Sequence, residues 1–133
     1  MAIKRYKATA DTTIVNAFEP NLQTRATGSN MGMADIMEVF SIYGRATSGS
    51  QELSRALVKF PTATISSDRT AGTIPGSGSV SFYLRLYGAK TSRTVPRDFK
   101  MVVNPIFTDW QEGVGLDLDT YKDETKGNTG ANW

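Results

Sequence analysis

The chain has 133 residues, a length typical of one domain, and its 39% apolar residues suffice for one modest hydrophobic core. It contains no cysteine, which excludes disulfide bonds and thiolate metal sites, and no histidine, which removes the commonest general base and the usual zinc ligand. The net charge of +2 is too small to indicate a nucleic-acid partner. We therefore expect a protein that works by binding and assembly and is not an enzyme.

Taken in chain order, the first residues, Met1–Lys7, include basic side chains, but no apolar stretch follows them, so we expect no secretory signal. No apolar run anywhere in the sequence is long enough to cross a bilayer, so we expect no membrane partner. Short apolar runs alternate with turn residues, and long helical periodicity is absent. This organisation is typical of an all-β sandwich or barrel.

The first strand is expected over Arg5–Ala10 and continues through Thr12–Val15, because Thr, Ile and Val suit a pleated, half-buried surface. The turn signal Glu19-Pro20-Asn21 then lies in a segment, residues 18–34, with two glycines and little apolar content. We predict that this segment is a long surface loop.

The apolar run Asp35–Tyr43 predicts a strand, because it is rich in β-branched and aromatic residues, although a helix is the alternative over so short a stretch. Leu53–Phe60 is the clearest strand, with Leu53, Arg55, Leu57 and Lys59 on one face and Ser54, Ala56, Val58 and Phe60 on the other, and Pro61 ends it. The following residues, Ile65–Ser79, are predicted to form a loop, with a short helical turn starting near Ser66.

Val80–Tyr87 alternates apolar with polar or aromatic residues, which predicts a strand with one buried face. We expect it to form a buried central pair with the strand Ser54–Phe60. A further strand is predicted over Asp98–Pro105, prolonged by Ile106–Trp110. The remaining residues, 111–133, are predicted to form an acidic, irregular C-terminal segment.

The charges are unevenly distributed. Residues 1–108 carry 13 Lys and Arg against 7 Asp and Glu, whereas residues 109–133 carry 2 against 6. A basic body with an acidic tail would allow head-to-tail binding between copies of the chain, although the charge pattern by itself does not favour it. The alternative is a solvated acidic loop, since runs of charge usually face water.

Five short motifs resemble, in order and spacing, those of the DNRLRE domain family. Ser54-Arg55-Ala56-Leu57-Val58-Lys59-Phe60 is similar to that family's "S-R-A-L-[LV]-x-F" strand, and Ala10-Asp11-Thr12-Thr13-Ile14 to its "A-D-T-x-I" start. The strand Val80–Tyr87, the element Trp110-Gln111-Glu112-Gly113 and the pair Asn132-Trp133 also resemble family elements. The resemblance covers nearly the full chain.

This resemblance implies an antiparallel jelly-roll β-sandwich, similar to carbohydrate-binding modules and without catalytic activity. Family members continue into closing strands after the pair that Asn132-Trp133 resembles. We therefore expect a jelly roll that is incomplete at its C-terminus and is completed by further chain or by a neighbouring subunit.

The segments Phe18-Glu19-Pro20-Asn21-Leu22 and Gly28-Ser29-Asn30-Met31-Gly32 resemble the version found in virion proteins of tailed bacteriophages. The resemblance thus implies a virion structural protein: a capsid decoration (cement) protein or a neck, tail or fibre component. Its partners would be other virion proteins and copies of itself. It would assemble in the bacterial cytoplasm and be extracellular in the released particle. The alternative is a carbohydrate-binding module that recognises a glycan on the host surface.

Candidate binding residues follow from these two hypotheses. Tyr83, Arg85 and Tyr87 share one face of a predicted strand and suit stacking on sugar rings or contact with a protein partner; the alternative is an ordinary second core. Trp110 is a candidate sugar platform, against the alternative of a buried structural role. Asp109 and Glu112 flank this tryptophan, as a glycosidase pair would, but two acids in a loop do not indicate catalysis.

The basic residues Lys4, Arg5 and Lys7 form an N-terminal arm that could lie on an acidic neighbouring subunit; the alternative is a frayed terminus.

Asp117, Asp119 and Asp123 have the spacing of an oxygen-rich calcium site, the one cofactor weighed. An EF-hand loop is rejected, because its sixth and twelfth positions would hold Lys122 and Asn128. A looser calcium site and a solvated acidic loop remain the alternatives.

Overall fold

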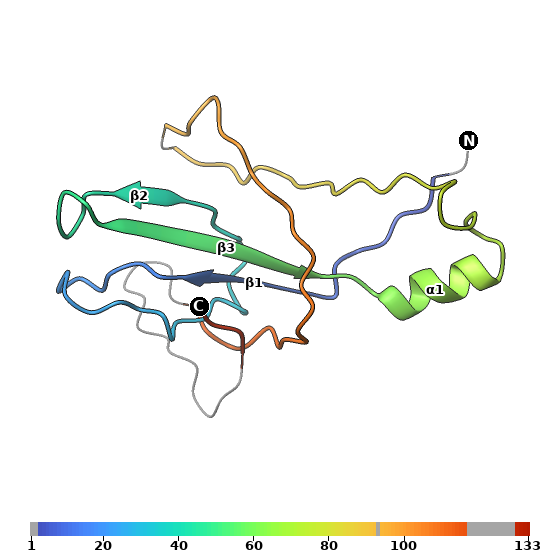
Figure 1. The fold of residues 1–133 in the computed structure, drawn as a ribbon, viewed down its shortest axis with the longest axis horizontal. Coiled ribbons are helices and arrows are strands. Elements are labelled where there is room, and N and C mark those ends of the chain that lie inside the picture. Colours follow the sequence, from blue (N-terminus) through green and yellow to red (C-terminus); the bar gives the residue numbers. More distant parts are fainter. Residues whose placement is uncertain (1–2, 93, 117–129) are drawn as a thin grey trace.

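A three-stranded antiparallel sheet organises the chain, with strand β3 (Gln51–Lys59) between β1 (Ala10–Val15) and β2 (Ser41–Tyr43) (Figure 1). The structure, a computed structural model, describes residues 3–92, 94–116 and 130–133. The β-rich, antiparallel architecture agrees with the sequence-based prediction. Among the described helices, none is long and apolar enough to cross a bilayer.

Both edges of β3 are occupied. On one side β1 pairs with it from Ala10↔Lys59 to Val15↔Ser54, and on the other side β2 pairs from Ser41↔Leu53 to Tyr43↔Gln51. The prediction that Ser54–Phe60 forms a strand is confirmed, but its predicted partner is wrong. The β2 ladder covers only residues 51–53 of its edge of β3, and Val80–Tyr87 forms no ladder with β3 in the described chain.

Two predicted strands are shorter than expected. The first begins at Ala10 rather than at Arg5, and of the run Asp35–Tyr43 only the last three residues, β2, form a strand. The residues before β2 approach β3 by isolated bonds instead: the Phe40 amide donates to the Ser54 hydroxyl (2.7 Å), and the Ser54 amide donates to the Phe40 carbonyl (3.1 Å).

Helix α1 (Thr62–Thr70) follows β3 directly, earlier and longer than the helical turn predicted near Ser66. Pro61 occupies the N-cap position, where its ring sets φ at −74° and ends the strand without requiring an amide donor. The helix buries none of its residues. It therefore depends on polar contacts with the N-terminal residues, described below, rather than on an apolar face.

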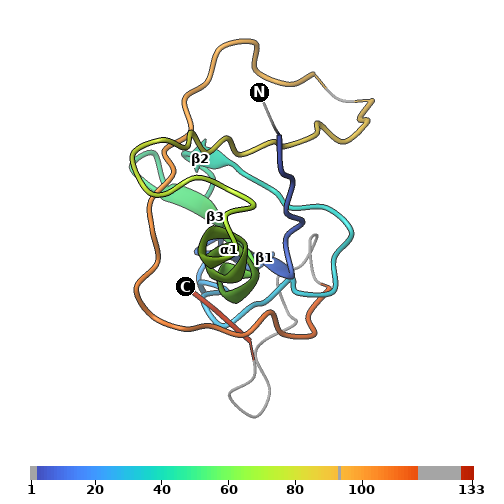
Figure 2. The ribbon, with the colours of Figure 1, turned by 90° about the vertical axis from the view of Figure 1, so that its right-hand side faces the viewer.

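Val80–Tyr87 and Asp98–Pro105 form no strand in the described part of the chain. Every described residue from 81 to 109 is exposed, so the predicted burial of one face is wrong as well. The yellow part of the ribbon stands away from the sheet as a wide loop in both views (Figure 1 and Figure 2). Alternation shows which residues could share a face, but a face is buried only where another layer covers it.

The hydrophobic core lies on one face of the sheet and is small. It comprises Val15, Ala17, Ala26 and Met31, with Ala34 and Phe40 packed against it. The segment 18–34 is irregular, as predicted, but its placement wholly at the surface is wrong, because it supplies Ala26 and Met31 to this core. A loop thus covers the face of the sheet that a second sheet would cover in a sandwich.

The accessible surface is large for a chain of this size. It amounts to 10348 Å², whereas a compact monomer of 14.5 kDa exposes about 6,900 Å². This excess of about 3,400 Å² on one chain is larger than the roughly 1,000–2,500 Å² that each partner contributes to an obligate interface, which buries about 2,000–5,000 Å² in total.

We expect Met31→Ala to destabilise the fold by roughly 2–5 kcal/mol, because the side chain is 2% exposed and its removal leaves a cavity in a small core. The matched control is Met33→Ala, two residues away, where the side chain is 58% exposed; its change should stay within about 0.5 kcal/mol. Urea unfolding followed by circular dichroism measures both. Equal effects of the two substitutions would contradict the position of the core.

Candidate functional site

Residues 81–92 and 94–109, named here the exposed arc, carry more than half of the large apolar side chains that the described residues expose. These side chains are Phe82, Tyr83, Leu84, Leu86, Tyr87, Val95, Phe99, Met101, Val102, Val103, Ile106 and Phe107. Monomeric soluble proteins rarely expose contiguous apolar surface beyond a few hundred Å². The exposed arc is therefore the strongest candidate for an interaction surface.

The predicted row Tyr83, Arg85 and Tyr87 lies on this arc. Tyr83 is 89% exposed and Tyr87 is 78% exposed. The guanidinium carbon of Arg85 lies 4.9 Å from the centroid of the Tyr87 ring, within reach of a cation–π contact. The alternative of a buried second core is not formed here, so all three side chains are accessible to a partner.

Trp110 ends the exposed arc and is half-buried. Next to it, Asp109 accepts a hydrogen bond from the Lys59 ammonium at 2.6 Å. This bond, followed by a bond from the Trp110 backbone, holds the pKa of Asp109 below its ordinary value of 3.8. Glu112 points elsewhere: its Oε1 accepts the Asp11 amide at 2.7 Å. Asp109 thus ties the end of the exposed arc to β3, and Glu112 ties the C-terminal segment to β1.

A single buried side chain, Asn30, holds the C-terminal segment in place. It is 1% exposed. Its amide nitrogen donates to the carbonyls of Glu112 (2.9 Å) and Ala131 (2.7 Å), and its oxygen accepts the amides of Gly32 (3.0 Å) and Gly115 (3.2 Å). The hydrogen-bonding capacity of the side chain is used in full, so its burial carries no unsatisfied polar group.

Close approach of the backbone to Asn30 requires glycine. Gly113 has a φ of +84°, a conformation that side-chain-bearing residues rarely adopt, and a Cβ atom there would overlap the Asn30 amide. A Cβ atom on Gly115 would overlap the Asn30 carbonyl. These two glycines let the C-terminal segment lie directly on the loop that carries Asn30.

The final residue also docks on the sheet. The Trp133 amide donates to the Thr27 carbonyl at 3.1 Å, and the guanidinium carbon of Arg55 in β3 lies 3.9 Å from the centroid of the Trp133 ring. Two segments quoted for the family resemblance, those of Glu112 and Trp133, therefore contact the sheet directly, and the third, that of Arg55, is part of strand β3. Their observed contacts are structural.

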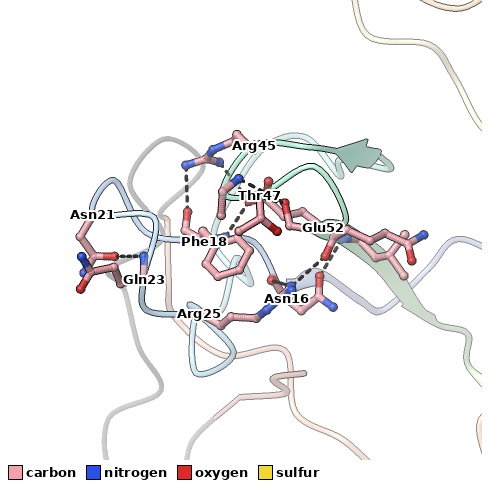
Figure 3. A network of polar contacts seen from close by, with 12 residues as sticks. Asn16, Phe18, Asn21, Gln23, Arg25, Arg45, Thr47 and Glu52 are labelled. Carbon is pink, nitrogen blue, oxygen red and sulfur yellow. Dashed lines mark hydrogen bonds and ion pairs between the residues drawn. The ribbon is translucent and has the colours of Figure 1, made fainter.

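A second polar network fixes the turn after β1 (Figure 3). Glu52 has no exposed surface, and its Oε1 accepts the Phe18 amide at 2.6 Å and the Arg45 guanidinium at 3.1 Å. Arg45 also donates to the Phe18 carbonyl at 3.0 Å. Glu52 Oε2 is buried without a hydrogen-bond partner among the described residues.

Arg25 completes this network from the other side (Figure 3). Its guanidinium donates to the carbonyls of Asn16 and Gln51, both at 2.8 Å, and stacks on the Phe18 ring at 4.1 Å. The Asn16 side chain in turn accepts the Leu53 amide at 2.6 Å. The network thus locks the loop onto the start of β3.

The two networks were not foreseen from the sequence. Of the two residues, Glu52 and Asn30, Glu52 was the more predictable. Its side chain lies on the same side of the predicted strand as those of Ser54 and Ala56, so its face of the sheet can be assigned from the sequence. The contacts of Asn30 had no such signal, because its partners at Glu112 and Ala131 lie 82 and 101 residues away.

The N-terminal arm docks on α1 of its own chain. Lys4 forms an ion pair with Asp68 at 3.2 Å, and the Tyr6 hydroxyl donates to the same carboxylate at 2.7 Å. The alternative of a frayed terminus is therefore wrong for these residues. Arg5 and Lys7 are exposed, and their binding to a neighbouring subunit stays a prediction.

These contacts shift two pKa values. The hydrogen bond from Tyr6, then that from Lys4, holds the pKa of Asp68 below its ordinary value of 3.8. The pKa of Tyr6 lies above its ordinary value of 10.0, first because the surroundings displace water from the hydroxyl and then because the hydroxyl donates to Asp68.

The predicted calcium ligands Asp117, Asp119 and Asp123 lie outside the described residues. Within the described residues, no group of three or more acidic side chains is close enough to hold a metal ion. Calcium binding at the acidic tail stays a prediction.

Comparison of the chain with models of known protein families, with curated proteins and with solved structures finds no match.

We expect Asn30→Ala to lower the free energy of unfolding by roughly 2–5 kcal/mol, since each buried backbone group left without a partner costs about 1–3 kcal/mol and water can reach some of them. Hydrogen exchange should accelerate most at residues 111–116 and 130–133. The exposed Asn104 provides a matched control, because Asn104→Ala should change stability by no more than about 0.5 kcal/mol. Unchanged exchange in the C-terminal segment would contradict the role of Asn30.

The docking of the N-terminal arm should depend on pH at both extremes. The pKa of Asp68 is lowered in the folded state, so its contribution is present above pH 3.8 and is lost as the pH falls through the lowered value. The pKa of Tyr6 is raised, so its contribution is present below pH 10.0 and is lost as the pH rises through the raised value.

Asp68→Asn should therefore bring the pKa of Tyr6 back towards 10.0, measured by nuclear magnetic resonance titration of the Tyr6 ring. Asp98→Asn, at an exposed acid of the arc, should leave the titration unchanged. A Tyr6 titration that is insensitive to Asp68→Asn would show that the arm is not docked there.

Proposed function

We propose that this chain is a non-catalytic structural protein of a tailed-bacteriophage virion, a capsid decoration protein or a component of the neck, tail or fibre. It acts through assembly contacts with other virion proteins and with copies of itself. The resemblance of its motifs to the DNRLRE domain family supports this class of protein. The incomplete sheet supports assembly as its mode of action.

The exposed arc is the observation that carries the proposal. A stretch of 28 described residues without a buried member, rich in large apolar side chains, gains little apolar burial from its own chain in this conformation. Burying about 3,400 Å² of accessible surface against partners would bring the chain to the surface area of a compact protein. Assembly would thus bury apolar surface that the fold of a single chain leaves exposed.

The finer fold belongs to the same proposal. The described strands form one sheet, and residues 80–109 contain two alternating stretches, Val80–Tyr87 and Asp98–Pro105, that match the pleat of a strand. We propose that these stretches become strands on assembly, which would complete a jelly-roll β-sandwich of the kind that the motif resemblance implies.

A carbohydrate-binding role is the second candidate. It is favoured by the exposure of Tyr83 and Tyr87, since aromatic faces free of protein contacts can stack on sugar rings. The half-buried Trp110 offers less free ring surface for this purpose. In this second role the partner would be a host-surface glycan.

The proposal is tested on particles of the phage that encodes the chain. Mass spectrometry of purified particles should find the chain at a fixed copy number, and electron microscopy should place it at one symmetric location. Phe107→Ser, at a side chain that is 95% exposed, should reduce incorporation at least tenfold without altering the fold. Val114→Ser is the matched control, exposed but outside the arc.

Absence of the chain from the particles would contradict a virion role. Specific binding of the isolated chain to a glycan array, lost on joint substitution of Tyr83 and Tyr87 by alanine, would favour the carbohydrate-binding role instead.

A further inference from the structure

The sheet has an open edge at β2. Because the Ser54 amide donates to the Phe40 carbonyl and the Gly44 amide donates to the Ser50 carbonyl, the residues between them alternate in direction. The backbone amides and carbonyls of Ser41 and Tyr43 therefore point away from β3. In the described part of the chain no strand pairs with this outer edge.

Natural sheets protect open edges with lysine, proline or an inward-pointing charge. The run 35–43, which ends in β2, contains neither lysine nor proline. All three residues of β2 are exposed, with Tyr43 68% accessible. This edge is therefore a ready template for another strand.

The stretch 80–90 has the properties of such a strand. Val80, Phe82, Leu84 and Leu86 alternate with polar or aromatic residues, and the stretch has no partner strand in the described chain. It contains two basic residues, Arg85 and Lys90, and no acidic one. The run 35–43 contains two acidic residues, Asp35 and Glu38, and no basic one. The two stretches are thus complementary in charge as well as in hydrogen-bonding capacity.

We propose that Val80–Tyr87 of one copy of this chain adds as a strand to the outer edge of β2 of a second copy. The inference rests on the proposed function, because it names the partner of the exposed arc. Strand addition at a sheet edge gives affinity through main-chain hydrogen bonds and specificity through the alternating side chains. A second copy fits best, since every copy carries both the template and the strand, and the accessible surface of 10348 Å² leaves ample area to bury in an obligate interface.

The absence of cysteine makes the pairing directly testable. Full-length chains carrying Tyr43→Cys are mixed with chains carrying Leu84→Cys and treated with a short bis-maleimide. The two substituted side chains are both exposed, so neither change should disturb the core. A heterodimeric cross-link between the two differently tagged chains is expected. A cross-link yield no higher than that of Tyr43→Cys mixed with Val114→Cys would overturn the proposal.

Sedimentation equilibrium and hydrogen exchange provide the second measurement. The apparent mass should rise at least twofold above 14.5 kDa as concentration increases, with amide protection appearing together at 41–43 and 80–87. Leu84→Pro removes a backbone donor and should return the chain to the monomer mass, whereas Ala89→Pro, beyond the paired stretch of the same arc, should not. A monomer at all concentrations would overturn the proposal. Protection of 80–87 in such a monomer would show that the strand folds back on its own chain.

The two proposals fail separately. A chain that associates through this pairing but is absent from virus particles would preserve the strand exchange and remove the virion role. A chain that is present in particles but never pairs with its own copies would overturn the strand exchange alone.

Discussion

Strand β3 can accept neighbours along two edges only, and this limit determines where the rest of the chain lies. Pairing with β1 brings residues 10–15 beside residues 54–59, and pairing with β2 occupies the other edge over residues 51–53. Every later strand must find either an outer edge of this small sheet or a second layer. The described part of the chain provides no second sheet, and the exposed arc forms no strand there.

Polar side chains hold together what a larger apolar core would otherwise hold. Asn30 joins the loop before β2 to the C-terminal segment, and Glu52 with Arg45 joins the turn after β1 to β3. Buried polar groups are favourable only when their partners are in place, and Glu52 keeps one oxygen without a partner among the described residues. The fold is therefore specified by a few directional contacts, each of which fixes one loop.

The sequence predicted those parts of the fold that depend on local pattern. A short run with a strand-like pattern and a terminating proline identified the strand that became β3, and β-branched residues identified most of β1. The same pattern misplaced Val80–Tyr87, because alternation defines a face but contains no information about what covers it. The role of Asn30 could not be predicted, since a polar residue in a loop does not indicate which distant carbonyls its side chain will bind. The exposure of Tyr83 and Tyr87 was one of two predicted alternatives, and the absence of a covering segment over them in the described structure decided between them.

The charge of the exposed arc explains how apolar surface of this extent can stay exposed before a partner binds. Residues 81–109 include five basic side chains, Arg85, Lys90, Arg93, Arg97 and Lys100, against Asp98 and Asp109. Like charges repel when two arcs meet, whereas the acidic run before β2 attracts the arc. Exposed apolar strands without such charges would pair indiscriminately with one another. The net positive charge of the arc therefore opposes aggregation between two arcs and favours binding at the edge of β2. The basic side chains of the arc thus both prevent pairing between arcs and favour the acidic run before β2 as the partner.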